Sequence, residues 1–467
     1  MNKHLRYFFL IICLLFQKPN ILAQTYYVSS TIGSNKNDGL SEMTPKCDLS
    51  DVPKKDVTIR LKCGDVFWGG IKGYTNCIIE SYGQGPRPVL CGFKVLKNLE
   101  AWKSAGSDLW ILDLSNGKDF VGNIGNESNA TINNIGFIYN PKLDKLYGRN
   151  VSELDSLKNE MDFFTSIFYS YEDVEKHPFK TVILKCEKNP AFLGNLCFPM
   201  SQHGIDQMSN CCIRGIAVVG FSKMGMVHFK ECLVEDCQID MIGGAIFLGN
   251  TRRSRYGNGI EFWYQYIDNT VTNCLISRTY DCATTIQANG IIQSNPRNIH
   301  FIRNRIYKCR QAFEHFINPS DKTLLQYENC DFSGNICCLM GDNDFNCPEP
   351  RDCNILSYEE DEKPITINNN VFWGANHLDG TISSADMGRN TVYLYTDQYL
   401  YTRHWHKDKR TIKSDEEGAI NRYRKVTGDK SKIIVLKRGS KKALRLEKKI
   451  KKKIAWKPVE LHLERII

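Results

Sequence analysis

Five stretches of the chain repeat one another loosely, and they read ECLVEDCQIDMIGGAI (231–246), NTVTNCLISRTYDCATTIQ (269–287), NIHFIRNRIYKCRQAFEHF (298–316), ENCDFSGNICCLM (328–340) and PITINNNVFWG (364–374). Ile276, Ile306 and Ile336 fall 30 residues apart. Self-similarity at a period of about 20 to 50 residues is typical of stacked repeats. The alternation of polar with Val, Ile and Phe residues predicts strands, and the shortage of leucine argues against leucine-rich repeats. We therefore expect an all-β solenoid, a parallel β-helix, in which each coil contributes three short strands.

Asparagines at the ends of the predicted strands support this fold. Asn273, Asn304 and Asn369 occupy similar places in their repeats. Asn tolerates the left-handed conformation of tight turns, and stacked Asn side chains can hydrogen-bond from coil to coil. A β-sandwich is the competing fold, and it requires hairpin signals between adjacent strands. The Asn-Gly pairs at 116, 258 and 289 are too few and too irregularly spaced for it.

The strand pattern divides the chain into three parts after residue 24. Residues 25–375 are predicted to form the β-helix, interrupted at about 124–200 by an inserted, loop-rich lobe in which the pattern breaks. Residues 376–467 are expected to form a C-terminal extension, because the repeat fades there. This extension includes a lysine-rich segment at 436–454, the basic tail.

The positive charge is concentrated at the two ends of the chain. The net charge is +9, of which the first 24 residues carry +3 and the basic tail, with ten Lys or Arg against Glu447, carries another +9. The remainder is therefore −3. A lysine run at a terminus is typically solvated and poorly ordered. We expect no nucleic-acid partner.

The first residues have the pattern of a secretory signal peptide. Lys3 and Arg6 precede an apolar run at 7–16, and Ala23 supplies the small residue of a cleavage site. Ten apolar residues are too few to span a bilayer as a helix, and no later stretch is long enough. We therefore expect residues 1–24 to be removed, no transmembrane segment, and a secreted, periplasmic or cell-surface protein.

Cysteine is abundant, with 19 residues in the chain. No Cys-x-x-Cys pair occurs, which argues against a zinc site of that type. Most cysteines lie within apolar stretches, where Cys packs as a small hydrophobic residue. We expect buried free thiols, and we expect one disulfide between Cys347 and Cys353, which lie in a polar loop.

Several segments resemble the secreted bacterial right-handed parallel β-helix proteins of the pectin-lyase-like superfamily. They are YYVSSTIGSNKNDGLSEMTP (26–45), LKCGDVFWGG (61–70), IIESYGQGPRPVLCG (78–92), RYGNGIEFW (255–263) and ISRTYDCATTIQ (276–287). The resemblance implies a right-handed helix, export, and carbohydrate as the ligand class. It specifies no reaction, because the superfamily includes lyases, hydrolases, epimerases and proteins without activity. The polygalacturonase motifs are absent from the sequence, and no calcium-binding Asp cluster of the pectate lyase kind stands out.

A basic cluster follows residue 249 in what is predicted to be an insertion between strands. Arg252, Arg253, Arg255 and Tyr256 lie in it. Guanidinium groups bind carboxylates and sulfates in forked geometry. These residues are candidates for binding an acidic polysaccharide, and a solvated basic loop is the alternative.

Aligning the repeats places two glutamates on one face of the solenoid. GIEFW (259–263), ATTIQ (283–287) and AFEHF (312–316) align through their small and apolar residues, which sets Glu261, Thr285 and Glu314 in one row. Coils about 4.8 Å apart would separate the two carboxylates by roughly 9 to 10 Å. That is near the upper limit for an inverting glycosidase. Trp263 can stack on a sugar ring, and Gln287 belongs to the same binding face.

β-Elimination uses the neighbouring residues differently. Arg255 or Arg310 would neutralise a uronate carboxylate, and His315, Lys308 or Tyr256 would remove the α-proton. Asp281 can orient a cation or hold a metal, so a divalent cation such as calcium is the one cofactor that we consider. His404 and His406 have the His-x-His spacing that can present two metal ligands on one strand face, and without a third ligand nearby we expect no metal site there.

The sequence thus predicts an exported protein that cleaves glycosidic linkages of a polysaccharide, by β-elimination or by hydrolysis. Its candidate catalytic residues are Glu261, Asp281, Glu314 and His315. The alternatives are a non-catalytic protein that binds glycans or assembles an exopolysaccharide, and an adhesin-like structural solenoid.

Overall fold

A computed structural model describes the chain from residue 23 to residue 461. The segments outside this description are 1–22, 123–134, 152, 166–180, 201, 246–254, 265, 293, 322–324, 342–344, 346–352, 358–364, 375–376, 380–384, 402–411, 428 and 462–467. Residues 1–22 of the predicted signal peptide, Cys347, Arg252, Arg253, His404 and His406 lie outside the described residues, whereas Gln24, the last residue of that predicted peptide, is the first residue of a strand. In the part that is described, no helix is long and apolar enough to cross a membrane.

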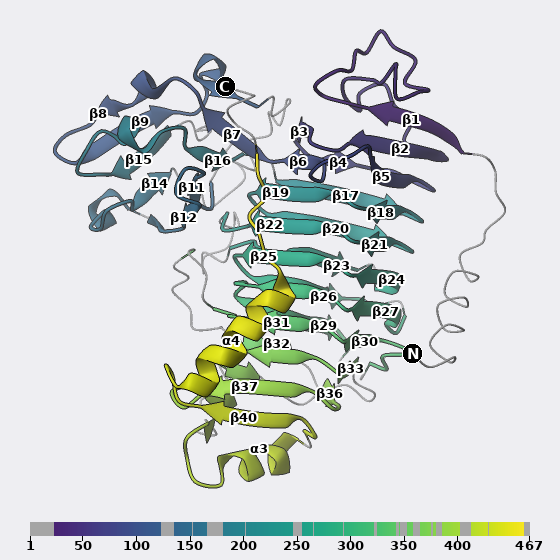
Figure 1. Cartoon of the computed structure of the whole chain (residues 1–467), viewed down its shortest axis with the longest axis vertical. Helices are drawn as coiled ribbons and strands as arrows, with labels where there is room; N and C mark the ends of the chain where they lie inside the picture. The colour runs from purple at the N-terminus through teal and green to yellow at the C-terminus, as the bar shows by residue number, and fades with distance from the viewer. Residues whose placement is uncertain are drawn as a thin grey trace.

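Three ten-stranded sheets form the body of the molecule, and the chain visits them in turn (Figure 1). Sheet 1 consists of β1 (Gln24–Val28), β2 (Val57–Lys62), β5 (Ile78–Tyr82), β18 (Cys212–Arg214), β21 (Leu233–Glu235), β24 (Ile267–Thr272), β27 (Arg297–Ile302), β30 (Asp331–Ser333), β33 (Ile365–Asn368) and β36 (Ala385–Met387). Sheet 2 consists of β3 (Val66–Trp68), β6 (Val89–Cys91), β19 (Ala217–Phe221), β22 (Gln238–Ile242), β25 (Leu275–Thr279), β28 (Arg305–Tyr307), β31 (Ile336–Cys338), β34 (Val371–Trp373), β37 (Thr391–Tyr395) and β40 (Lys432–Leu436). Sheet 3 consists of β4 (Ile71–Lys72), β17 (His203–Ser209), β20 (Met224–Lys230), β23 (Ile260–Trp263), β26 (Cys282–Gly290), β29 (Gln311–Pro319), β32 (Cys353–Ser357), β35 (His377–Asp379), β38 (Tyr399–Tyr401) and β39 (Ile412–Lys413).

Nearly all pairing within these sheets is parallel, as a β-helix requires. One coil is β24, β25 and β26, and each of these strands pairs in parallel with β27, β28 and β29 of the next coil. The antiparallel exception is β38 with β39 at the last coil. A single apolar core runs through the interior, with Ile59, Ile213, Phe262, Phe301 and Ile367 among its members. The all-β class and the parallel sheets agree with the sequence prediction.

A ladder of buried asparagines marks the corner between sheets 1 and 2. Asn304, Asn335, Asn370 and Asn390 each donate Nδ2–H to a backbone carbonyl of the preceding coil. Each Oδ1 accepts the backbone N–H of the residue below it in the stack, as Asn304 Oδ1 does from Cys274. The predicted alignment of Asn273 and Asn369 with Asn304 is wrong by one residue. Asn273 and Asn369 precede the ladder positions and supply the left-handed turn, with φ of 56° at both.

The inserted lobe begins earlier than the sequence predicts, and it is built of strands. Its two antiparallel-rich sheets contain β7 (Phe93–Leu96), β8 (Lys103–Ser104), β9 (Leu109–Asp113), β10 (Phe120–Val121), β11 (Ile138–Asn140), β12 (Lys145–Tyr147), β13 (Asn150–Val151), β14 (Phe163–Thr165), β15 (Thr181–Lys185) and β16 (Cys197–Pro199). Four 3-10 helices, Leu99–Ala101, Gly117–Asp119, Leu154–Ser156 and Pro190–Leu193, complete it. The lobe has its own core and packs on the outer face of sheet 2 through Phe93, Phe137 and Tyr139. Its strands end at Pro199, close to the expected boundary of 200.

The C-terminal region also differs from the expectation. The coils continue past residue 375 through β36, β37, β38 and β40, so the extension proper begins after Leu436. The basic tail is an ordered helix, α4 (Lys441–Ile454), which crosses sheet 2, while α3 (Ala419–Thr427) lies at the end of the last coil (Figure 1). Ala443, Ile450 and Ile454 bury the apolar side of α4 against the sheet, and the lysines face outward. A lysine count alone misses this because three apolar residues at helical spacing decide the packing.

Sixteen cysteines within the described residues are free thiols. Most of them are buried, as predicted. Cys237, Cys274, Cys309 and Cys337 follow one another in the core of successive coils. The predicted disulfide between Cys347 and Cys353 lies outside the described residues.

Candidate active site

The two glutamates lie in one row on the outer face of sheet 3. Glu261 of β23 pairs in register with Thr285 of β26, and Thr285 pairs with Glu314 of β29. The predicted alignment of the three repeats is therefore confirmed. Residues flanking them in the strands, such as Ile260 and Phe313, point into the core, so the row points outward. Two strand spacings place the backbones of Glu261 and Glu314 about 9 to 10 Å apart.

Glu261 is a buried carboxyl group with a shifted pKa. Its exposed fraction is 3%, and Oε2 accepts a hydrogen bond of 2.7 Å from Asn258 Nδ2. Burial raises the pKa of Glu261 to about 7, the charge of Asp281 acts in the same direction, and Asn258 and His228 oppose it. Removing a carboxylate from water disfavours its charged form. Glu261 can consequently hold a proton near neutral pH.

Glu314 is held by donors from the neighbouring coil. Its Oε2 accepts from Gln287 Nε2 at 2.6 Å, from Cys282 Sγ at 3.2 Å and from Thr285 Oγ1 at 3.4 Å. Its exposed fraction is 6%. These donors fix the orientation of the carboxylate. Gln287, predicted to contact substrate, lies on this face and supports Glu314.

Asp281 and Arg310 form an ion pair at the corner that leads from sheet 2 into sheet 3. Asp281 Oδ1 lies 3.7 Å from Arg310 Nη1. The Arg310 guanidinium also lies 5.8 Å from the ring centroid of Tyr280 and is almost fully buried. Arg310 is thus positioned by protein groups, which differs from its predicted role in holding substrate. Asp281 borders the site, close enough to influence Glu261.

His315 does not belong to the site, which corrects its prediction as a catalytic residue. It follows Glu314 in β29, and alternation along a strand sends it to the opposite side. Its ring is fully buried in the interior, 5.9 Å from the centroid of Phe313 and 5.5 Å from that of Tyr327. Burial lowers the pKa of His315 to about 3, so the imidazole is neutral.

Arg255 and Tyr256 connect parts of the protein to one another. Arg255 donates to the backbone oxygen of Gly244 at 2.9 Å and to that of Asn150, in the lobe, at 2.8 Å. Its predicted role in binding substrate is therefore replaced by a structural one. The ring of Tyr256 lies 4.7 Å below Lys223 Nζ at the same corner. Arg252 and Arg253 are outside the description.

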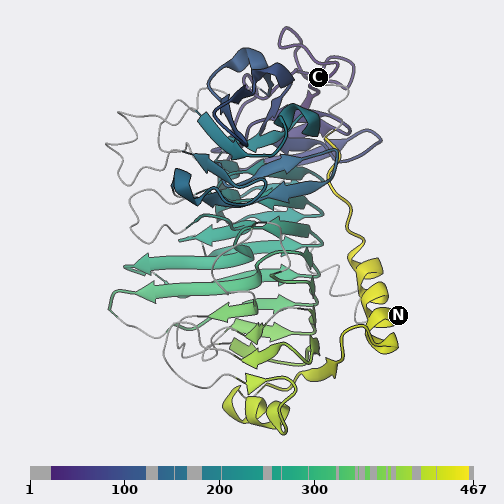
Figure 2. The same cartoon turned by 90° about the vertical axis from the view of Figure 1, so that its left-hand side faces the viewer.

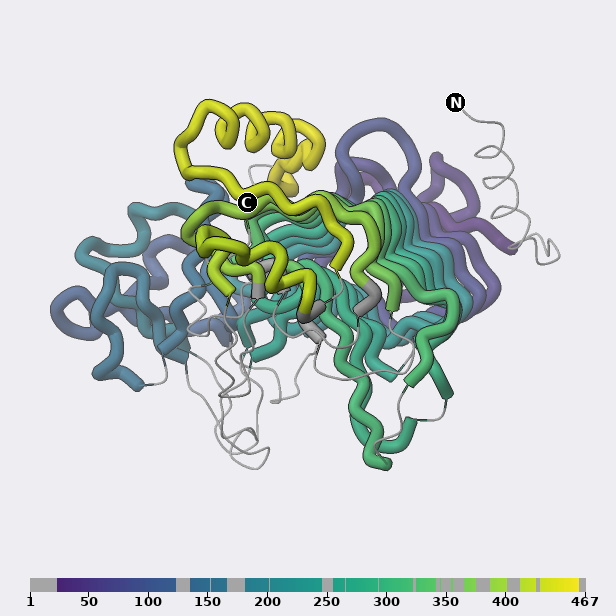
Figure 3. The backbone as a smooth tube through the Cα atoms, turned by 90° about the horizontal axis from the view of Figure 1, so that it is seen from below, coloured from purple at the N-terminus to yellow at the C-terminus, as the bar shows by residue number. Residues whose placement is uncertain are grey.

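Trp263 lies two residues after Glu261 at the end of β23, on the same outward face of sheet 3. It pairs with Gln287, is half-buried, and contacts Tyr264 edge-on at 5.1 Å between centroids. β26 and β29, nine residues each, project beyond the neighbouring strands at this end (Figure 2). Viewed along the solenoid, this projection and the lobe stand on different sides of the stack (Figure 3).

A second polar group on sheet 3 was missed by the sequence analysis. Asp206 of β17 contacts His228 of β20, Lys72 of β4 and His203. Asp206 pairs with Val227, and Val227 pairs with Glu261, so the group lies two strands from Glu261 in the same row. Residues 203–206 precede the stretch in which the repeats were recognised. Extending the alignment backwards by two coils would have found them.

Among the residues that the structure describes, no three His, Cys, Asp or Glu side chains gather as a metal site. Asp281, considered as a cation ligand, has Arg310 as its neighbour. The geometry therefore gives calcium no specific ligand set within these residues.

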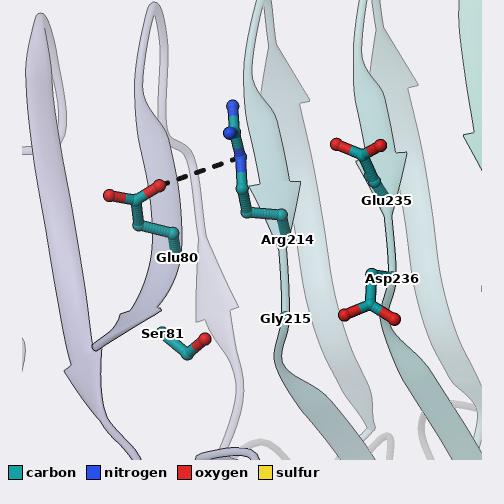
Figure 4. A pocket seen from close by; sticks show the side chains of 6 residues that line it. All are labelled: Glu80, Ser81, Arg214, Gly215, Glu235 and Asp236. Carbon is teal, nitrogen blue, oxygen red and sulfur yellow. Dashed lines mark ion pairs between the residues drawn. The ribbon is translucent and has the colours of Figure 1, made fainter. Parts of the chain in front are cut away.

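A shallow hollow of about 300 Å³ lies elsewhere, on sheet 1 (Figure 4). Two of its carboxylates have arginine partners: Arg214 Nε lies 3.8 Å from Glu80 Oε2, and Asp236 binds Arg87. None of the predicted site residues borders it. The carboxylate row on sheet 3 remains the candidate active site of this β-rich, coil-stacked protein.

No family model and no curated protein sequence matches the chain. Solved structures similar to it include XylC in complex with xylose, at 9% identity and TM-score 0.47, covering 81% of this chain and 71% of that one. Another is a glycoside hydrolase at 10% identity and TM-score 0.41, covering 82% and 94%. A third is the GH136 lacto-N-biosidase from Eubacterium ramulus, at 10% identity and TM-score 0.36, covering 88% and 67%. At these identities and scores, the likeness identifies no family.

Proposed function

We propose that the protein is a glycoside hydrolase acting on a polysaccharide, with Glu261 as general acid and Glu314 as general base. The observation that carries this proposal is the burial of Glu261, whose pKa is raised to about 7, in register with a second carboxylate. Glycosidases use two carboxyl groups in different protonation states, and the environment of each group sets its state.

Glu261 suits the role of proton donor. A group with a pKa near the working pH is both protonated and able to release its proton. Asn258 fixes one oxygen of the carboxyl group, which leaves the other oxygen to carry the proton toward the leaving glycosidic oxygen.

Glu314 suits the role of base at the far side of the linkage. The backbone separation of about 9 to 10 Å is near the upper end of the range that leaves room for water between two carboxyl groups. We therefore propose hydrolysis with inversion at the anomeric carbon. Trp263, half-buried on the same face, offers a ring on which a sugar can stack.

β-Elimination receives less support. Three of the five residues proposed for it from sequence are engaged elsewhere: Arg255 with the lobe backbone, Arg310 with Asp281, and His315 in the core. The alternative is a non-catalytic protein that binds glycans or takes part in their assembly. It would bind the glycan on the same face of sheet 3 without any proton transfer from Glu261 or Glu314.

We further propose that the coils wind in the right-handed sense and that the chain is exported after removal of residues 1–24. Both rest on the sequence. N-terminal sequencing of the protein recovered from cell fractions tests the second, and an uncleaved protein retained in the cytoplasm would contradict it.

The test of the function is incubation of the purified protein with neutral and acidic polysaccharides. New reducing ends without ultraviolet absorbance from unsaturated uronates are expected, and the anomeric configuration of the first product, measured by NMR, should be inverted. Absorbance rising together with reducing ends would instead establish a lyase. Binding without any product would establish the non-catalytic alternative.

Glu261→Gln and Glu314→Gln should each lower kcat by about 10²- to 10⁴-fold, because each removes one proton transfer. Glu235→Gln is the matched control, since Glu235 lies on sheet 1 away from the row. Full activity in both Glu261→Gln and Glu314→Gln would refute the assignment.

A further inference from the structure

The missed group on sheet 3 is organised around one carboxylate. Asp206 Oδ1 lies 2.7 Å from His228 Nδ1, and Asp206 Oδ2 lies 3.2 Å from Lys72 Nζ and 3.6 Å from His203 Nδ1. Both oxygens are therefore engaged within the protein. Although burial opposes it, hydrogen bonds from His203 and His228 hold the pKa of Asp206 well below its usual range.

Exposure differs sharply between the carboxylate and its partners. The side chain of Asp206 is 8% exposed, whereas that of Lys72 is 59% exposed and that of His228 is 36% exposed. A ligand approaching this face meets the ammonium and the imidazole. The negative charge lies beneath them, with its acceptor oxygens already used.

The orientation of His228 follows from its partner. Because Asp206 is ionised, Nδ1 of His228 donates to it, and the opposite ring nitrogen, Nε2, points away from Asp206. Lys72 has three ammonium donors and uses one on Asp206. The exposed donors of the group are therefore the two remaining N–H bonds of Lys72 and, when the ring carries both protons, Nε2–H of His228. Such an arrangement fits an oxyanion better than a sugar hydroxyl, which both donates and accepts.

The position of the group relates it to Glu261. Lys72, Asp206, Val227 and Glu261 follow one another in register on four successive strands of sheet 3. Asp206 lies two strand spacings, about 9 to 10 Å, from Glu261. His228 follows Val227 in β20 and is near enough for its charge to oppose the effect of burial on Glu261.

We propose that Lys72 and His228, oriented by Asp206, form a subsite that binds the carboxylate or sulfate of an acidic sugar beside the linkage cleaved at Glu261. This rests on the proposed hydrolase function and names its substrate class, an anionic polysaccharide. The chain of sugars would run along the solenoid axis across sheet 3. Asp206 is a positioning residue, and Lys72 and His228 contact the ligand.

Binding is measured by isothermal titration calorimetry in the Glu261→Gln protein, so that turnover does not interfere. The probes are polygalacturonate, alginate, the same two polymers after carboxyl reduction to neutral sugars, and chondroitin sulfate. At least one anionic polymer should bind about tenfold or more tightly than the reduced polymers. Comparing the affinities for the two uronate polymers with the affinity for chondroitin sulfate shows which anion the subsite prefers. Equal affinity for reduced and unreduced polymers, with no gain for the sulfated one, would overturn the proposal.

Lys72→Gln and His228→Gln should each remove about tenfold of that preference and leave the affinity for reduced polymer unchanged. Lys432→Gln, an exposed lysine on sheet 2, should change neither. A preference that survives in both Lys72→Gln and His228→Gln would also overturn the proposal.

The two proposals fail separately. A preference that depends on Lys72 and His228, in a wild-type protein that cleaves none of these polymers, supports the subsite and contradicts the hydrolase. Cleavage of a neutral polymer at the same rate as its anionic form supports the hydrolase and contradicts the subsite.

Discussion

Glu314 and His315 are neighbours in the sequence and lie in opposite environments. The carboxylate of Glu314 faces outward among three donors, whereas the imidazole of His315 lies between aromatic rings in the core, where burial lowers its pKa to about 3. Glu261, on the outer face, is buried as well, and its pKa moves up to about 7. Burial favours the neutral form in both cases. Of these two neutral groups, only Glu261 can serve the proposed reaction as an acid, because only Glu261 lies on the outer face beside the second carboxylate.

The pKa of Glu261 predicts the pH dependence of activity. If Glu261 is the general acid, kcat/KM should fall as pH rises through about 7, because the proton to be donated is lost. The measurement is kcat/KM against pH with the polysaccharide found to be cleaved. An alkaline limb far above pH 7, or one that persists in the residual activity of Glu261→Gln, would assign the acid to another group.

The same group links stability to pH. The pKa of Glu261 is about 7 in the folded protein against an ordinary 4.5, so between these values the folded state retains a proton that the unfolded state releases. Its contribution to the free energy of unfolding is complete below pH 4.5 and is lost as pH rises through about 7, by up to about 3 kcal/mol. Denaturant unfolding of wild type and Glu261→Gln at several pH values measures it. The difference between the two proteins should grow with pH in favour of the Gln variant, and a constant difference would contradict the assignment.

At the scale of single elements, the corners between strands are held by defined hydrogen bonds, as the strands themselves are. The side chains of the asparagine ladder hydrogen-bond to backbone groups of successive coils at the corner between sheets 1 and 2. Asn335 Nδ2 donates to Phe301 O at 2.9 Å, and its Oδ1 accepts from the backbone of Asn304 at 2.8 Å. Buried backbone groups need such partners.

Asn335→Ala should lower the free energy of unfolding by about 1 to 3 kcal/mol, because it leaves buried donors and acceptors without partners. Denaturant titration followed by circular dichroism measures this loss. Asn318→Ala, at an exposed position near the end of β29, is the control and should change stability by less than about 0.5 kcal/mol. Equal losses in the two variants would mean that the ladder adds nothing beyond an ordinary surface asparagine.

At the scale of the whole molecule, Arg278 joins the solenoid, the lobe and the C-terminal segment. Its guanidinium pairs with Asp240 of sheet 2, with Nε 2.8 Å from Oδ1, and with Asp144 of the lobe at 2.7 Å. It also lies 5.1 Å from the ring of Trp456, which follows α4 and donates to Ser277. The chain beyond α4 returns along the stack toward the lobe (Figure 1). Three distant parts of the chain thus meet at one buried charge.

Arg278→Ala should lower the free energy of unfolding by about 3 to 5 kcal/mol, because it leaves the fully buried Asp240 without its cation. Chemical denaturation measures the loss, and limited proteolysis should show the lobe cleaved faster. Arg422→Ala removes an exposed ion pair with Glu416 and should cost at most about 1 kcal/mol. A similar, small cost in both variants would show that Arg278 does not hold these parts together.

The sequence by itself determined the β class, the stacking of coils and the register of Glu261, Thr285 and Glu314. It could do so because these features depend on local alternation and on a repeat of about 30 residues, both of which are visible along the chain. The same alternation predicts that His315 points into the core when Glu314 points outward, although the choice of His315 as a catalytic residue overlooked this. The asparagine ladder was found with an error of one residue, since Asn serves both the turn and the stack.

Only the tertiary structure decided which charged groups reach the site. Arg255 and Arg310 are bound by protein groups from other coils or from the lobe, and Asp206 and His228 join Glu261 across strands that lie far apart in sequence. The folding of the basic tail into α4 likewise depends on the surface of sheet 2 that receives it. Contacts between distant segments have no local signal in the sequence, because the energy of a charge depends on what the fold places beside it.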